Sequence, residues 1–249
     1  MPTDEWMERY RTVKEQLACK VDLDAYFTED AIAGTKVVVL DMGAVRFPTG
    51  SIIACAPLVS LEDARPYLQT VPAGTYPLKI CVVPSDEYGD RYACAKVELS
   101  DRKPIRYELA MVGDEDLDDF EDGVFFGFFV DAGMACVADA ATQEAFRAYW
   151  AARLEKDDSI DPYNDLFCDL LEESAREHPE YQGEYGDRLI WTIPGTECDL
   201  PIFAAGWGDG VYPVYFGYDA SGEVSGVYVH LIDIAESYRD PGDGDGPAR

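Results

Sequence analysis

Short apolar segments follow one another along most of this chain, and polar stretches rich in turn residues separate them. Clear examples are YPLKICVV at 76–83, RYACAKVEL at 91–99 and IRYELAMV at 105–112, with Pro, Gly, Asp and Ser between them. Segments of this length are typical of strands, because a helix that buries one face needs a longer run with a period near 3.6. The short separators favour antiparallel connections. The sequence therefore predicts a β-rich fold.

Further segments of the same kind extend the prediction over both halves of the chain, at 35–43, 51–58, 123–130, 187–193, 199–206, 211–219 and 226–234. Residues 219–222 (DASG) are expected to form the hairpin turn that joins the last two strands. Trp6, Tyr10, Val13 and Leu17 are spaced by three or four residues, which predicts a helix over 4–19. Two more helices are predicted at 140–155 and 164–177, within a helical insert at 140–177.

These elements predict an α+β fold, with an antiparallel β-rich core shaped as a sandwich or a strongly curved sheet and about three helices. The chain is short enough for one large domain, which we expect over residues 1–238. Residues 239–249 contain glycine, proline and aspartate almost throughout, so we expect a flexible acidic tail there.

Charge is the strongest indication of function. The chain has 49 acidic and 20 basic residues, for a formal net charge of −29. This charge repels phosphate backbones and anionic membrane surfaces, so neither nucleic acid nor a membrane is an expected partner. It attracts basic proteins over a long range. The alternative is that the charge serves only solubility or a saline cytoplasm.

The cysteines indicate a reducing compartment. All seven are far apart in the sequence and form no C-x-x-C pair, so neither a zinc site nor a redox motif is expected. They are Cys19, Cys55, Cys81, Cys94, Cys136, Cys168 and Cys198. The first residues have no apolar core of a secretion signal, and no apolar run reaches the length of a membrane span. These features predict a cytoplasmic protein with free thiols.

One polar separator, at 114–122 (DEDLDDFED), is far more acidic than the others. Its acidic residues are Asp114, Glu115, Asp116, Asp118, Asp119, Glu121 and Asp122. A calcium loop of this spacing would need glycine at its sixth position and glutamate at its twelfth, where this chain has Asp119 and Phe125. We therefore expect no metal here, and we interpret the loop as a contact surface for a basic partner.

Candidates for catalysis are few, and each has a structural alternative. His230 lies in the predicted strand 226–234, where it either faces a pocket or packs as an ordinary strand residue. Cys136 is flanked by small residues, but its acidic surroundings disfavour a reactive thiolate. No Walker loop, G-x-S-x-G elbow, dinucleotide-binding fingerprint or H-E-x-x-H helix occurs, and no cofactor is predicted.

Aspartates at the ends of predicted strands are the other candidates: Asp41, Asp131, Asp139, Asp209 and Asp233. Such residues converge in some metal-dependent or acid–base sites. They also end strands by accepting turn amides. Asp209, between Gly208 and Gly210, favours the turn interpretation.

Four blocks resemble a known bacterial family, domain of unknown function 4241: 47–58, 71–80, 127–139 and 206–224. Their order and spacing match over about residues 35–235. The resemblance implies a largely cytoplasmic protein and carries no activity with it. It directs attention to Asp131, Gly133, Cys136, Asp139, Gly208, Asp209, Gly210 and Tyr212. Family members usually read Asp-Pro-Leu where this chain has Ala56-Pro57-Leu58, so a catalytic role of that aspartate would be lost here.

Charge, the acidic loop and the lack of a complete catalytic set together favour a binding protein, of the immunity type that neutralises a basic partner. A carboxylate- or metal-dependent hydrolase that uses Asp131, Asp139 and Asp209 is the alternative. A small-molecule binder that uses the aromatic C-terminal strands is a third hypothesis.

Overall fold

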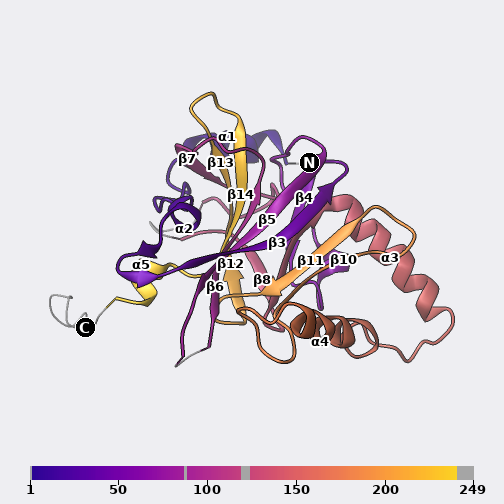
Figure 1. Cartoon of the computed structure of the whole chain (residues 1–249). Helices are drawn as coiled ribbons and strands as arrows, with labels where there is room; N and C mark the ends of the chain where they lie inside the picture. Colours follow the sequence, from indigo (N-terminus) through magenta and orange to yellow (C-terminus); the bar gives the residue numbers. More distant parts are fainter. Residues whose placement is uncertain (1, 87–88, 119–123, 240–249) are drawn as a thin grey trace, which may run out of the picture.

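Two antiparallel sheets form the centre of the molecule, and the helices lie outside them (Figure 1). The computed structural model describes residues 2–86, 89–118 and 124–239. The larger sheet has the strand order β3-β5-β6-β14-β13-β7. Its strands are β3 (Val38–Phe47), β5 (Gly74–Val83), β6 (Arg91–Glu98), β7 (Arg106–Leu109), β13 (Val214–Tyr218) and β14 (Val224–His230). The turn predicted at 219–222 joins β13 to β14, where Asp219 N donates to Glu223 O.

The smaller sheet has the order β10-β11-β9-β4. Its strands are β10 (Arg188–Thr192), β11 (Asp199–Ala204), β9 (Met134–Asp139) and β4 (Ile52–Cys55). Two short ribbons complete the β structure: β1 (Ala31–Ile32) with β2 (Thr35–Lys36), and β12 (Gly210–Tyr212) with β8 (Phe128–Val130). Within the predicted strand at 123–130, residue 123 lies outside the described part of the chain, and β8 is the only strand among the described residues 124–130. The predicted α+β class is confirmed.

Three helices of the described chain have ten or more residues: α1 (Asp4–Val13), α3 (Ala140–Leu154) and α4 (Cys168–Glu177). The short helices are α2 (Ala25–Thr28), α5 (Ile234–Ser237) and the single turns Leu61–Asp63 and Tyr163–Phe167. Within the insert 140–177, both predicted helices are confirmed.

The predicted helix 4–19 is too long. Helix α1 ends at Val13, and Cys19 N donates instead to Tyr107 O of β7 at 3.2 Å. This hydrogen bond to the sheet gives the backbone N–H of Cys19 an acceptor without a longer helix, and Leu17 is buried in the core.

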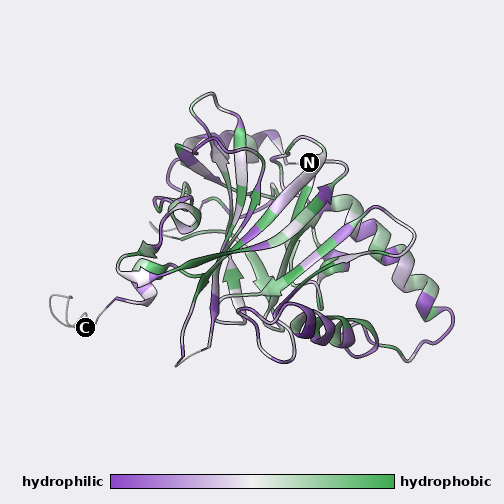
Figure 2. Cartoon of the chain, viewed as in Figure 1, coloured by the Kyte–Doolittle hydropathy of each residue, from purple (hydrophilic) through white to green (hydrophobic). Residues whose placement is uncertain are grey.

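The molecule has two apolar cores. The larger core is shared by the two sheets and includes Phe47, Ile80 and Phe216 of the larger sheet with Val137 and Phe203 of the smaller. The second core lies between the smaller sheet and the helices α3 and α4, and it includes Ile53, Cys136, Phe146, Phe167 and Ile202. Figure 2 shows that the strands at the centre are apolar, whereas α4 at the periphery is strongly hydrophilic.

An ion pair between the half-buried Arg46 and the buried Asp199 connects the two sheets. The guanidinium of Arg46 on β3 donates to both carboxylate oxygens of Asp199 on β11, at 2.8 and 2.5 Å, and the backbone N–H of Arg46 donates to the same side chain at 3.0 Å. Ala204 packs against both cores. The single domain over 1–238 stays a prediction, and the predicted tail lies outside the described residues apart from Arg239.

Candidate functional site

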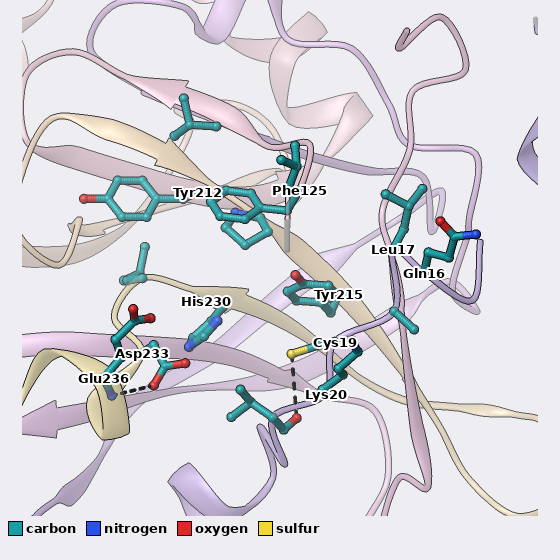
Figure 3. Close-up of a pocket in the computed structure, with 16 residues that line it drawn as sticks. Gln16, Leu17, Cys19, Lys20, Phe125, Tyr212, Tyr215, His230, Asp233 and Glu236 are labelled. Atoms are coloured by element: carbon teal, nitrogen blue, oxygen red, sulfur yellow. Dashed lines mark hydrogen bonds between the residues drawn. The ribbon is translucent and has the colours of Figure 1, made fainter. Parts of the chain in front are cut away.

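A cavity of about 380 Å³ opens at one end of the larger sheet, between the loop after α1, the ribbon strand β12 and the segment after β14 (Figure 3). Leu17, Tyr212 and Tyr215 contribute apolar wall. Its polar groups come from Gln16, Cys19, Lys20 and His230, with Asp233 and Glu236 at the α5 side. The predicted candidate His230 therefore does face a cavity.

His230 is held as a neutral ring. Its Nε2 lies 3.4 Å from the hydroxyl of Tyr26, and the two rings meet edge to face. Burial lowers the pKa of the imidazole, and the nearby carboxylate of Asp233 only partly opposes this effect. A neutral histidine acts as a proton acceptor when a nucleophile lies in the same cavity.

Cys19 is the thiol of this cavity, and sequence reasoning did not single it out. Its position depends on the contact with Tyr107 across the sheet, which leaves no local signal in the sequence. Burial raises the pKa of the thiol to about 11, and the Sγ–H donates to Val21 O at 3.7 Å. Because the thiolate is the reactive form, Cys19 is a poor nucleophile at neutral pH.

Cys136, the candidate thiol named from the sequence, is fully buried in β9. It faces Cys55 of β4 directly across the sheet, with the two Sγ atoms 3.4 Å apart. The hydrogen bond with Cys136, together with burial, raises the pKa of Cys55 well above its usual range. All seven cysteines are free thiols in the structure. Cys136 is thus a small core residue.

Asp139 is a structural acceptor at the end of β9. Its carboxylate is fully buried and accepts hydrogen bonds from the backbone N–H groups of Thr49, Gly50 and Ala141 and from the Thr49 hydroxyl, at 2.7 to 2.9 Å. The bond from Ala141 caps the N-terminus of α3. No acceptor site is left for a substrate.

Asp209, like Asp139, accepts backbone N–H groups, which is the role that the turn interpretation gives it. One carboxylate oxygen accepts the backbone N–H groups of both Ala132 and Gly133 at 2.9 Å, and these bonds lower its pKa. Gly208 before it has a φ of +104°, a conformation that favours glycine. The hydroxyl of Tyr212 donates to Gly208 O at 2.7 Å and fixes the turn. Gly210 has no positive φ and belongs to β12.

The strand-end aspartates do not form one site. Gly210 pairs with Val130, so Asp209 and Asp131 lie at the same end of the β8–β12 ribbon. Asp139 lies at the far end of β9 from that ribbon. Asp41 accepts Gly43 N, and Asp233 caps α5. Among the described residues, no group of three or more His, Cys, Asp or Glu side chains is placed to hold a metal ion.

The acidic loop is largely occupied by contacts within the chain. Asp114 pairs with Arg65, and Asp118 pairs with Arg9 of α1 at 2.9 Å. Glu115 accepts three backbone N–H groups, from Val112, Gly113 and Asp114 itself. Asp116 accepts Asp118 N. Asp119, Glu121 and Asp122 lie outside the described residues.

A second acidic region, which sequence reasoning did not single out, extends from the end of α3 past α4. Its acids are Glu155, Asp157, Asp158, Asp161, Asp165, Asp169, Glu172, Glu173, Glu177, Glu180, Glu184 and Asp187. Lys156 and Arg176 are its only basic residues. In the described part of the chain none of these twelve acids forms an ion pair. A count of charges along this helical insert would have found it.

Fold and site together define an acidic α+β protein in which four of the five strand-end aspartates, Asp41, Asp139, Asp209 and Asp233, accept backbone N–H groups. The chain belongs to the family described as "Protein of unknown function (DUF4241)", which matches residues 45–229. The resemblance of the four blocks is thereby confirmed. No curated protein and no solved structure matches the chain. No helix in the described residues is long and apolar enough to cross a membrane.

Proposed function

We propose that this chain is an acidic binding protein that recognises and neutralises a basic protein partner, in the manner of an immunity protein. The supporting observation is the run of twelve acids over residues 155–187 that have no ion pair among the described residues. Like charges held together without counterions repel one another, and a cationic surface relieves that repulsion when it docks.

The hydrolase alternative receives less support. Asp139 is saturated by hydrogen bonds from the chain itself, and one carboxylate oxygen of Asp209 is used by two backbone amides. Asp131 lies near Asp209 but at the other end of β9 from Asp139, so the three carboxylates do not face one substrate. General acid–base chemistry needs carboxyl groups that face one substrate and are not already used as hydrogen-bond acceptors. A partner that is a protein is also consistent with net charge −29, which disfavours nucleic acid and anionic lipid.

We also propose a cytoplasmic location, because seven free thiols suit a reducing compartment.

The function is tested by affinity capture from the source cell at low and at high salt, followed by reconstitution with the purified captured protein. We expect a basic protein that is released by salt, re-forms a stoichiometric complex and loses its own activity in that complex. A captured protein that is acidic, or that keeps full activity when bound, would contradict the proposal. Turnover of an ester or phosphoester substrate that Asp209→Asn abolishes would favour the hydrolase instead.

A second candidate, a small-molecule binder, is favoured by the cavity in Figure 3, because about 380 Å³ between Tyr212, Tyr215 and His230 suits a small ligand. A ligand that raises the Tm of the wild type but not of Tyr215→Ala would support it. The absence of any such ligand in a metabolite screen would remove it.

A further inference from the structure

A groove of about 400 Å³ runs between helix α4 and two outer strands, β3 of the larger sheet and β10 of the smaller. Helix α4 packs beside β10, away from α1, α2 and α5 (Figure 1). The groove thus lies within the region of unpaired acids and at the junction of the two sheets. We call it the α4 groove.

The floor of the α4 groove is apolar. Leu40 and Met42 come from β3, Leu170 comes from α4, and Ile190 and Trp191 come from β10. All five side chains are half-buried, so part of each remains in contact with water. An apolar surface of this kind gains free energy when a partner covers it.

The rim of the α4 groove is acidic. Asp41, Glu173, Glu177 and Glu180 line it, and all four are exposed and without an ion pair in the described chain. Glu173 and Glu177 are four residues apart on α4, so they lie on the same face of the helix. The negative end of the α4 dipole, at Glu177, adds to the field that attracts a cation.

The one arginine of the groove does not cancel this field at the surface. Arg188 is buried, and its guanidinium donates to the backbone carbonyls of Glu180 and His178 at 2.6 and 3.2 Å and lies 3.3 Å from the hydroxyl of Tyr92. Its donors hold the segment after α4 in place. The rim carboxylates remain available to an external cation.

We infer that the α4 groove binds a segment of the basic partner in which arginine or lysine side chains alternate with apolar ones. The cationic groups meet Asp41, Glu173, Glu177 and Glu180, and the apolar side chains cover the floor at Leu40, Met42 and Trp191. This inference rests on the proposed function, since it gives the basic partner a place to bind. Charge complementarity selects the partner class, and the apolar floor distinguishes a specific groove from general attraction.

The test uses labelled peptides of about eight residues, one that alternates arginine with leucine and one that alternates arginine with serine. Binding is measured by fluorescence anisotropy to the full chain, to E173Q/E177Q and to the control E155Q/D158N. Both variants remove two exposed acids from the same region, but Glu155 and Asp158 do not line the groove. We expect E173Q/E177Q to weaken binding of the arginine–leucine peptide roughly tenfold at low salt and the control less than about twofold.

The arginine–serine peptide is expected to bind more weakly to the wild type, because it cannot cover the apolar floor. Equal losses in the two variants, or equal binding of the two peptides, would overturn the groove as the site and leave the proposed function standing. Failure of both peptides to bind the wild type at low salt would contradict the groove, and failure of the captured basic protein to re-form its complex would contradict the proposed function.

Discussion

The described part of the acidic loop, residues 114–118, and the rim of the α4 groove are both rich in carboxylates. They differ in whether other groups of the chain already bind those carboxylates. In the loop, Asp114 and Asp118 have arginine partners and Glu115 caps three backbone amides. Around the groove, Glu173 and Glu177 have no ion pair in the described residues. Acid density alone therefore does not identify a binding surface, because acids that hold the fold together are no longer free to attract a partner.

We expect the largest loss of stability at Asp139, because this buried acid accepts four hydrogen bonds from the chain itself. Asp139→Ala leaves the buried N–H of Gly50 and the partly buried donors of Thr49 and Ala141 without an acceptor, and it removes the cap of α3. We expect the free energy of unfolding to fall by about 3–4 kcal/mol. Urea denaturation measures it, and a loss below about 1 kcal/mol would contradict the structural role.

The next largest effect comes from comparing the stability of two variants, Glu115→Ala in the acidic loop and Glu173→Ala at the α4 groove. The first removes the acceptor of three backbone N–H groups and should cost about 2 kcal/mol. The second removes an exposed acid without an ion pair and should change stability by less than about 0.5 kcal/mol. Equal effects in the same denaturation experiment would break the comparison.

The ion pair between the sheets gives a pH dependence. Burial alone would raise the pKa of Asp199, but hydrogen bonds from Arg46 and Thr192 outweigh it and hold the pKa below its usual range. A lowered folded-state pKa gives stability that is present above about pH 4 and lost as pH falls through the folded-state value. Asp199→Asn should cost about 1–2 kcal/mol at pH 7, and the gap to wild type should narrow as the medium becomes acidic. A gap that stays constant from pH 7 to about pH 2 would contradict this account.

The smallest expected effect is that of Asp209→Asn. The asparagine side chain keeps an oxygen that accepts the amides of Ala132 and Gly133, so the Tm should change by only about 1–2 °C. Gly208→Val is the matched contrast, because valine is strained at a φ of +104° and should lower the Tm further. A reversed order of the two variants in calorimetry would contradict the turn interpretation.

Much of the fold could be predicted from sequence because its signals are local. The hairpin at 219–222 and the helices α3 and α4 follow from turn residues and helical spacing in neighbouring positions. No predicted segment covers β9, although the sequence places Asp139 at a strand end, because β9 is buried on both faces and has mostly small residues that show no alternation. The end of α1 could not be predicted either, since it depends on a backbone hydrogen bond between Cys19 and Tyr107, which are far apart in the sequence.

The site was harder to predict than the fold. The sequence shows that 114–122 is acidic, but only the structure shows that Arg9 and Arg65 come from distant segments to neutralise its acids. The α4 groove combines residues from β3, α4 and β10 that are far apart along the chain. Its apolar floor belongs to segments that, read singly, look like ordinary strands and an ordinary amphipathic helix.

Mapping by NMR tests the central claim, that the basic partner binds at the acids the fold leaves unpaired. An unlabelled arginine–leucine peptide is added to the ¹⁵N-labelled full chain, and amide shifts are followed residue by residue. We predict that the changes concentrate at 40–42 of β3, 170–177 of α4 and 189–191 of β10. Changes that concentrate instead on α1 and residues 114–118 would contradict the claim.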